Sequence, residues 1–327
     1  MKNTIFEKSK SWIHQNARPL DLARFCYHFE NGSKEAVIDA LQQYQNEDGG
    51  FGHALEADCF NPNSSPIQTW AATEILWEVQ EKESFSPIIK NIIKYLDSGK
   101  DFDGNAWRNT IPSNDLYPRA SWWNFREQEE QAINYNPTIA LAGFVLMHAN
   151  QQEALYKKCI DIVNSVIDAL LNTDTCNEMH TLSCFVRMTE YCRHARLTEL
   201  FHLEEMEQVL REKIVMAITE DTSTWKNCYV CKPSQFIRSK ESVYYKTLAE
   251  IAEYECKFIE SNQLEDGTWS VNWAWDDCQE EWHLAKNWWK ADIIIKNILF
   301  LDGVSEQYNF TSRNMIRKLY CVNLHTK

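Results

Sequence analysis

Carboxylates that follow glycine-containing turns are the residues of this sequence best suited to proton transfer. Four of them are predicted to be catalytic: Glu56, Asp58, Asp276 and Asp277. Two carboxylates at one site can divide the work of a general acid and a general base. The alternative for the same residues is structural, because carboxylates are also favoured at helix N-termini and on solvated rims.

Side chains that could hold a substrate lie near these carboxylates in the sequence or on the helices that follow. They are His53, Trp70, Arg119, Trp122, Trp123, Trp282, His283 and Trp288. Indole faces stabilise cations and pack on apolar or sugar rings. The chain holds 13 tryptophans, which indicates either a thick aromatic core or an aromatic-lined cavity.

The composition argues against several partners and compartments. A formal net charge of −14 weighs against nucleic acids and anionic membrane surfaces. No run of about 18 apolar residues predicts a membrane span, and the N-terminal segment has no apolar run typical of a signal peptide. The eleven cysteines are expected to be reduced thiols packed as small apolar groups, as in a cytoplasmic protein.

Helices in pairs are the elements predicted to position these residues. Nine glycines and eight prolines are too few for the many turns of an all-β fold. Serines before two of the segments, Ser33 and Ser65, are expected to cap helix N-termini. Apolar residues recur at helical spacing in 19–30, 33–45, 66–80, 86–98, 137–149, 152–171, 179–194, 203–219, 241–262, 281–301 and 311–322, with a short segment near 233–239.

Two kinds of helix alternate along the chain. The first of a pair is the more apolar, as in 137–149, and the second has one apolar stripe and a charged face, as in 203–219. An all-round apolar helix is buried, and an amphipathic one is peripheral. The sequence therefore predicts an all-α fold in a single domain over 1–327: an α/α toroid, or (α/α)6 barrel, of about six inner and outer helix hairpins.

One loop motif occurs twice in the chain. Gln45–Phe51 and Gln263–Trp269 both read Q-x-E-D-G-x-aromatic, and Asp103–Trp107 is a degenerate third copy. Asp-Gly favours a tight turn in which glycine takes a positive φ. The glutamine can bond backbone groups left open at a helix end. The motif is therefore expected to brace neighbouring hairpins, which is a structural role.

These repeats resemble the QW-type repeats of squalene and oxidosqualene cyclases. The longer run 45–76, in which a GGFG loop leads through a polar stretch into a predicted helix, is similar to the repeat of protein prenyltransferase β subunits. The chain thus resembles the terpene cyclase and protein prenyltransferase superfamily. That resemblance implies the α/α toroid and an aromatic-lined central cavity for an apolar isoprenoid or a similar small molecule.

The catalytic signatures of that superfamily are incomplete here. Squalene-type cyclases carry their acid in a D-x-D-D motif, of which only Asp276-Asp277 is present, and no D-D-x-x-D run for Mg²⁺ occurs. The zinc site of the prenyltransferases implies an Asp-x-Cys pair and a histidine, which Asp276, Cys278 and His283 could supply as a minor option. The main expectation is that the protein has no cofactor.

Three functions follow as hypotheses. The first is a terpene-cyclase-like or prenyltransferase-like protein that binds an apolar small molecule. The second is a carbohydrate-active α/α-barrel enzyme, of lyase or glycosidase type, with a carboxylate pair at the barrel mouth. The third is a non-catalytic toroid scaffold. A dry aromatic cavity would favour the first, an open acidic groove with tryptophan platforms the second, and a filled barrel axis the third.

Overall fold

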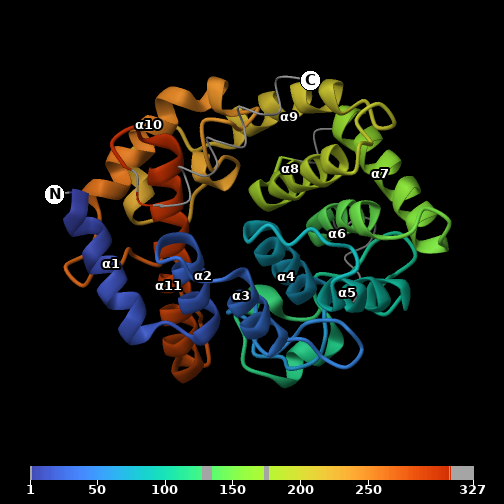
Figure 1. The fold of residues 1–327 in the computed structure, drawn as a ribbon, viewed down its shortest axis with the longest axis horizontal. Coiled ribbons are helices and arrows are strands. Elements are labelled where there is room, and N and C mark those ends of the chain that lie inside the picture. Colours follow the sequence, from blue (N-terminus) through green and yellow to red (C-terminus); the bar gives the residue numbers. More distant parts are fainter. Residues whose placement is uncertain (1, 127–134, 173–176, 309, 311–327) are drawn as a thin grey trace. The chain divides into compact units, whose positions relative to one another are not determined.

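The computed structural model describes residues 2–126, 135–172, 177–308 and 310. Within these residues the chain forms eleven α-helices and four short 3-10 helices, and its only β-structure is isolated bridges (Figure 1). The prediction of an all-α fold is confirmed. The segment 311–322, which the sequence predicts as a helix, lies outside the described residues.

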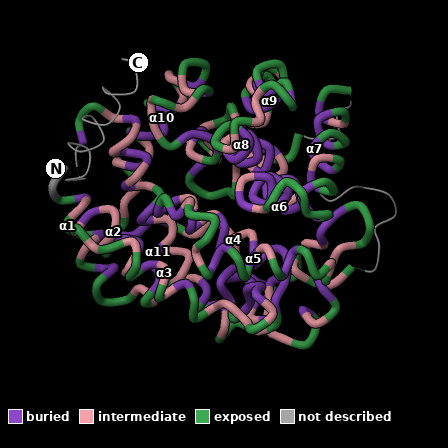
Figure 2. Tube along the Cα trace, turned by 45° about the vertical axis from the view of Figure 1, so that its right-hand side comes forward, coloured by how far each residue is buried: buried purple, intermediate pink, exposed green. Residues whose placement is uncertain are grey.

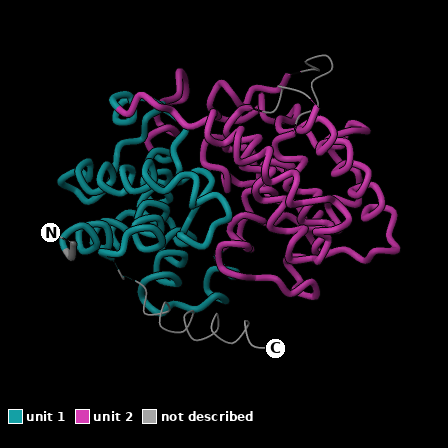
Figure 3. The backbone as a smooth tube through the Cα atoms, turned by 90° about the horizontal axis from the view of Figure 1, so that it is seen from above, with its two compact units in different colours: residues 1–40, 223–273, 284–327 teal, residues 41–222, 274–283 magenta. Residues whose placement is uncertain are grey.

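The chain divides into two compact units (Figure 3). Unit 1 comprises residues 1–40, 223–273 and 284–327, and unit 2 comprises 41–222 and 274–283. The single domain expected over the whole chain stays a prediction, because the two units are each compact by themselves.

Unit 2 is built around a buried helix. Its helices are α4 (Pro66–Glu78), α5 (Pro87–Asp97), α6 (Tyr135–His148), α7 (Ala154–Asn172), α8 (Met179–His194) and α9 (Leu203–Ala217). Helix α6 is buried along most of its length and contacts α4, α5, α7 and α8 (Figure 2). Gly143 permits close packing, because a Cβ there would lie 3.0 Å from the Cα of Met188 on α8.

The neighbours of α6 are of the two kinds that the sequence predicts. Helix α5 buries one stripe, which contains Ile88, Ile92 and Leu96, and exposes its charged residues. The apolar helix α6 has no such exposed face, since its residues from Pro137 to Leu146 are all buried. Burial of an all-round apolar helix beside amphipathic ones follows directly from their hydrophobic patterns.

Unit 1 contains one helix that the sequence patterns did not single out. Its helices are α1 (Lys2–Asn16), α2 (Pro19–Phe29), most of α3 (Lys34–Gln42), α10 (Tyr245–Ser261) and most of α11 (Gln279–Val304). Helix α1 was missed because its buried stripe mixes Ile5, Trp12 and Ile13 with the polar Ser9, all at helical spacing. A stripe with so few apolar residues gives a weak periodic signal.

Two predicted caps are confirmed. The Ser65 hydroxyl accepts a hydrogen bond from the Gln68 backbone at 3.3 Å, with Pro66 as the first residue of α4. The Ser33 hydroxyl accepts one from the backbone of Ala36 at 3.1 Å. Serine satisfies one of the backbone N–H groups that the first turn leaves open. The cap at Ser65 also fixes the start of α4, which carries the predicted site residue Trp70.

Candidate functional site

The two copies of the loop motif form the same turn. The side chain of Gln45 donates to Gly49 O at 3.0 Å, and that of Gln263 donates to Gly267 O at 3.2 Å. The two glycines have φ values of +96° and +91°. Each motif aspartate accepts from the backbone N–H two residues later, at 3.0 Å in both turns. The similarity of the two motif sequences therefore extends to these hydrogen bonds of the turns.

Each turn also holds a second helix of its own unit. Gln45 Nε2 donates to Ile88 O in the first turn of α5 at 3.2 Å. Gln263 Nε2 donates to Ile5 O of α1 at 2.9 Å. These bonds satisfy backbone carbonyls through one side-chain amide. The motif residues thus brace helices, as predicted, and are not candidates for catalysis.

The third copy shares the bond made by its aromatic residue. The backbone N–H of Trp107 donates to the Thr138 hydroxyl of α6 at 2.9 Å. Likewise, the backbone N–H of Phe51 donates to the Thr69 hydroxyl of α4 at 3.1 Å. In both cases a loop aromatic is tied to the start of an apolar helix. Asp103 caps the third turn by accepting from the Ala106 N–H at 2.9 Å.

Three loops of unit 2 meet at Asp58. Its backbone carbonyl accepts from the Ala120 N–H at 2.9 Å. Its Oδ1 accepts from the indole N–H of Trp275 at 2.8 Å. The Ser121 hydroxyl in turn donates to Asp276 Oδ2 at 3.1 Å. The candidate residues of these three loops are therefore neighbours, as the repeated loop positions predict.

Helix α4 fixes the position of Asp58 through a short relay. The Asp58 N–H donates to Glu56 Oε2 at 3.1 Å, and the Glu56 N–H donates to Gln68 Oε1 at 2.9 Å. The Gln68 amide also donates to Cys59 O at 3.0 Å. Glu56, predicted to be catalytic, therefore acts at least as a brace for the backbone of Asp58. Burial raises the pKa of the neighbouring Cys59 thiol to about 12, so this thiol stays protonated.

The side chain of Asp58 is buried beside an aromatic cluster. Asp58 and Trp275 are each 3% exposed, and Trp282 is 5% exposed. The Trp275 ring lies 5.8 Å from the Phe60 ring, edge to face, and 5.9 Å from the Trp282 ring. A carboxyl group is rarely so buried without a partner, and here an indole donor satisfies one of its oxygens.

The remaining carboxylates of the site are open to solvent. Asp276 and Asp277 are exposed, as is the imidazole of His283, whose Nδ1 contacts the carbonyl of Gln279 within the same helix. Trp122 is 40% exposed. The site thus has a buried acid on one side and an exposed acidic surface with a tryptophan on the other.

Arg119 and Trp123 complete the loop over 112–125. The Arg119 guanidinium pairs with Asp115 at 2.6 Å and donates to Tyr117 O at 3.0 Å. The buried Nε of Arg119 and the buried indole N–H of Trp123 have no hydrogen-bond partner. Since buried donors normally have partners, these two groups could serve polar atoms of a ligand.

The other predicted binding residues are more dispersed. His53 Nε2 lies 2.9 Å from Asn46 Oδ1 in the first motif turn. Trp70 lies on α4, and its buried indole N–H has no hydrogen-bond partner. Trp288 belongs to unit 1, where the Arg18 guanidinium sits 5.2 Å from its ring centre.

A charged group lies one turn along α4 from Trp70. Glu74 accepts from Arg187 of α8 at 2.7 Å, and Arg187 also stands over the Trp77 ring, 5.3 Å from its centre. Burial alone would lower the pKa of Arg187, but Glu74 and Glu190 raise it, so the guanidinium stays charged. The Glu74–Arg187 ion pair therefore joins the Trp77 end of α4 to α8.

The predicted zinc trio does not assemble. Asp276, Cys278 and His283 are not among the sets of three ligand atoms that lie within 4.8 Å of one another in the described residues. The trio therefore supports no metal centre.

Sequence reasoning did not single out Trp275, Phe60 and Gln68, which hold or surround Asp58. The run Trp273–Cys278 did carry a signal, because it places an indole directly before two aspartates. The partner of that indole could not be read from the sequence, since Asp58 lies 217 positions away.

Comparisons with other proteins add no family assignment. No protein-family model matches the chain, and neither a curated protein nor a solved structure matches it.

None of the helices in the described part of the chain combines the length and apolar character needed to cross a bilayer. Two surface hollows of about 150 and 420 Å³ lie beside α7 and α9, and no predicted site residue lines them.

Proposed function

We propose that this chain is a closed α/α toroid of the terpene-cyclase and prenyltransferase type that binds an apolar isoprenoid, with Asp58 as its reactive acid. The observation that carries the proposal is the buried carboxyl group of Asp58, bonded to Trp275, whose ring packs with those of Phe60 and Trp282. Protonation of an alkene needs an acid shielded from water, and the resulting cation is stabilised by aromatic faces.

The buried groups of the site have roles in that chemistry. Asp58 transfers a proton to an alkene carbon, and the resulting cation loses a proton or gains water to complete the reaction. The indole N–H of Trp275 stabilises the carboxylate that remains after the transfer. Glu56 and Gln68 keep the acid in place through the backbone. Asp276 and Asp277 are exposed and take no step in this isoprenoid chemistry.

The motif turns support ring closure. The turn 263–269 follows α10, yet it bonds α1 at the other end of the chain through Gln263 and Ile5. The other motif turn, 45–51, follows α3 and bonds α5 through Gln45 and Ile88. A bond from a late hairpin to the first helix is what a closed ring of hairpins requires. A cytoplasmic location is part of the proposal, because the nine described cysteines are all free thiols.

An exposed surface favours carbohydrate binding as a second candidate. Trp122 is 40% exposed beside Ser121, whose hydroxyl holds the exposed Asp276. Sugar rings stack on exposed indoles, and paired carboxylates perform glycoside chemistry. The two candidates differ in the acid they use: Asp58 for an isoprenoid, and Asp276 or Asp277 for an oligosaccharide.

The test is product analysis with matched variants. Purified protein is incubated with squalene, geranylgeraniol or geranylgeranyl diphosphate, and the extract is examined by gas chromatography and mass spectrometry. Asp58→Asn keeps an oxygen that can accept from Trp275 but has no acidic proton. We expect it to lose about 100-fold or more in turnover, in line with the loss of a general acid.

The control is Asp276→Asn, which removes an exposed carboxylate from the same site. We expect this variant to retain turnover of the isoprenoid within a few-fold. Full turnover by Asp58→Asn would contradict the proposed acid. Turnover of cello- or malto-oligosaccharides that is lost in Asp276→Asn or Asp277→Asn would establish the second candidate instead. A folded protein inactive on both substrate classes would favour the scaffold hypothesis.

A further inference from the structure

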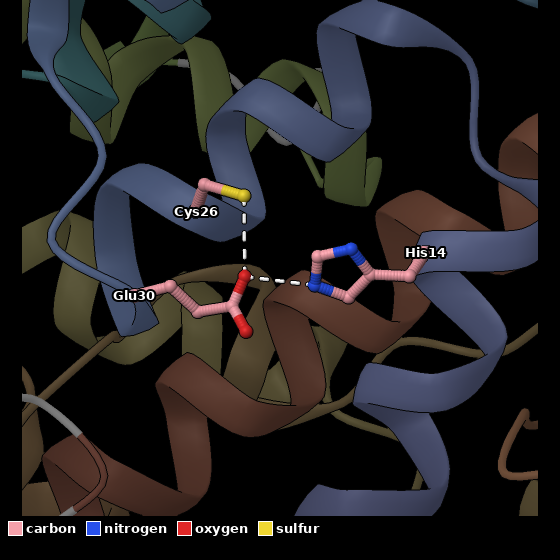
Figure 4. Close-up of side chains that lie close together, drawn as sticks. All are labelled: His14, Cys26 and Glu30. Carbon is pink, nitrogen blue, oxygen red and sulfur yellow. Dashed lines mark hydrogen bonds and ion pairs between the residues drawn. The ribbon is translucent and has the colours of Figure 1, made fainter.

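Three side chains with metal-ligand chemistry converge in unit 1, on the hairpin of α1 and α2 (Figure 4). His14 lies in the last turn of α1. Cys26 lies on α2, and Glu30 is the residue that ends it, so the two share one helix face. Glu30 Oε2 accepts from the Cys26 thiol at 3.2 Å and lies 2.8 Å from His14 Nε2.

We propose that His14, Cys26 and Glu30 bind a divalent cation of the zinc class. Imidazole nitrogen, thiolate sulfur and carboxylate oxygen are the ligand types that zinc takes in proteins. Their ligand atoms all lie within 4.8 Å of one another, and no other group of three does so in the described part of the chain.

Two of the three spacings between the ligand atoms already approach those around a coordinated ion. Bonds of about 2.0–2.3 Å in a tetrahedron place neighbouring ligand atoms about 3.3–3.6 Å apart. The two distances from Glu30 Oε2, 3.2 Å to Cys26 and 2.8 Å to His14, need to lengthen by only a few tenths of an ångström.

Outer contacts hold the ligands in orientation. Lys10 Nζ pairs with Glu30 Oε1 at 2.6 Å, which leaves Oε2 directed at the other two ligands. The His14 ring packs edge-on against Phe25, with ring centres 6.4 Å apart. Such outer partners are a regular feature of metal sites in proteins. The His14 side chain is 43% exposed, so a water molecule or a small ligand can reach a fourth position.

A nucleophilic cysteine is the competing interpretation of the same cluster, and two observations weigh against it. A reactive cysteine is a thiolate beside a cationic histidine. Here the Cys26 thiol and the His14 imidazole both contact the Glu30 carboxylate instead of each other. Burial, and then the Glu30 carboxylate, raise the pKa of Cys26 to about 11. A bound cation displaces the thiol proton to solvent and forms the sulfur–metal bond, with no change of oxidation state.

The experiment measures zinc and cobalt binding to the full chain. Protein is stripped with a chelator, titrated with Zn²⁺ by calorimetry, and separately loaded with Co²⁺ for absorption spectroscopy. We expect one equivalent of zinc, and a thiolate-to-cobalt charge-transfer band in the near ultraviolet. Cys26→Ser should abolish that band, and both Cys26→Ser and His14→Gln should weaken zinc binding beyond the about 10–100-fold typical of outer-shell changes.

A matched control is Cys228→Ser, which removes an exposed thiol of unit 1 outside the cluster. It should bind zinc as the unaltered protein does. Glu30→Gln keeps the shape of the third ligand without its charge and should bind more weakly, while circular dichroism verifies that each variant is folded. Absence of a stoichiometric site, or equal zinc binding by folded Cys26→Ser, would overturn the proposal. The proposed zinc site does not depend on the proposed isoprenoid function.

Discussion

The two motif turns share the bonds of their glutamine to glycine and of their aspartate to the backbone, yet the loops that follow them differ. After the turn 45–51 the chain buries Asp58, which is 3% exposed, against aromatic rings. After the turn 263–269 it leaves Asp276 and Asp277 in solvent. The motif therefore joins helices in the same way at two places, while the burial of the carboxylates depends on the residues that come next.

The likeness extends to how closely each turn approaches its second helix. A Cβ on Gly49 would meet the backbone oxygen of Asn91, and one on Gly267 would meet that of Lys8. Asn91 and Lys8 each lie three residues after the carbonyl that the motif glutamine holds. The same short segment thus docks on two helices in the same register, which is what a structural repeat means physically.

Substitution of the motif glycines should give the largest losses in the free energy of unfolding. At Gly49 and Gly267 a Cβ would lie 2.1 and 2.5 Å from a backbone oxygen, whereas Gly104 of the third copy has nothing within 4 Å. All three have positive φ. Alanine should therefore cost about 3 kcal/mol or more at the first two positions, through strain plus overpacking, and about 1–2 kcal/mol at Gly104. Urea denaturation of the three variants measures this, and equal losses would refute the docking argument.

The motif glutamines rank next. Gln263 Nε2 donates to Ile5 O, Ser9 Oγ and Gly267 O, and Gln45 Nε2 donates to two carbonyls. Replacement by methionine preserves most of the volume and removes the donors. We expect a loss of about 2–3 kcal/mol at Gln263 and a smaller one at Gln45, because the carbonyls lose partners. Thermal unfolding of both variants checks the order, and a larger loss at Gln45 would reverse the comparison.

Substitutions of Asp58 and of Asp276 should differ in their effect on protein stability as well as on activity. Asp58→Ala leaves the buried indole N–H of Trp275 without its acceptor and should cost about 1–2 kcal/mol. Asp276→Ala removes an exposed side chain and should change stability by less than about 0.5 kcal/mol. Chemical denaturation of the pair tests this. Equal losses would show that the burial of Asp58 is not energetically distinct.

The smallest expected effect is on the pH dependence of stability when the motif aspartates are substituted. Burial alone would raise the pKa values of Asp48 and Asp266, but hydrogen bonds from Ser64 and Thr268, with nearby lysines, lower both on balance. A lowered folded-state pKa stabilises the fold above about pH 4, the ordinary value, and that contribution is lost as the pH falls further. Asp48→Asn and Asp266→Asn should each make the acid-side fall in melting temperature shallower. A steeper fall would contradict the sign.

Much of the fold was predictable because its signals are local. Helix α4, with Ser65 as its cap and Pro66 as its first residue, and the all-apolar α6 were readable from spacing alone. Helix α1 was not, since the partners that bury Ile5 and Ser9 are distant in the sequence. Local periodicity reports a helix only when enough of its stripe is apolar.

The proximity of the loops that carry Asp58 and Asp276 was predictable, and their bonding was not. Residue types placed Asp58 and Asp276 in loops that follow equivalent turns, and the structure brings those loops together through Trp275 and Ser121. Which carboxylate is buried depends on contacts between segments more than a hundred residues apart. The cluster at Cys26 escaped for the same reason, because His14 comes from a helix that the pattern had missed.

Native mass spectrometry of protein purified from its own host tests the central claim most directly. The account predicts a bound apolar lipid of isoprenoid type, retained when Asp58 is changed to asparagine, because that variant alters the acid and leaves the aromatic rings in place. A protein that arrives with a sugar and without lipid would contradict it.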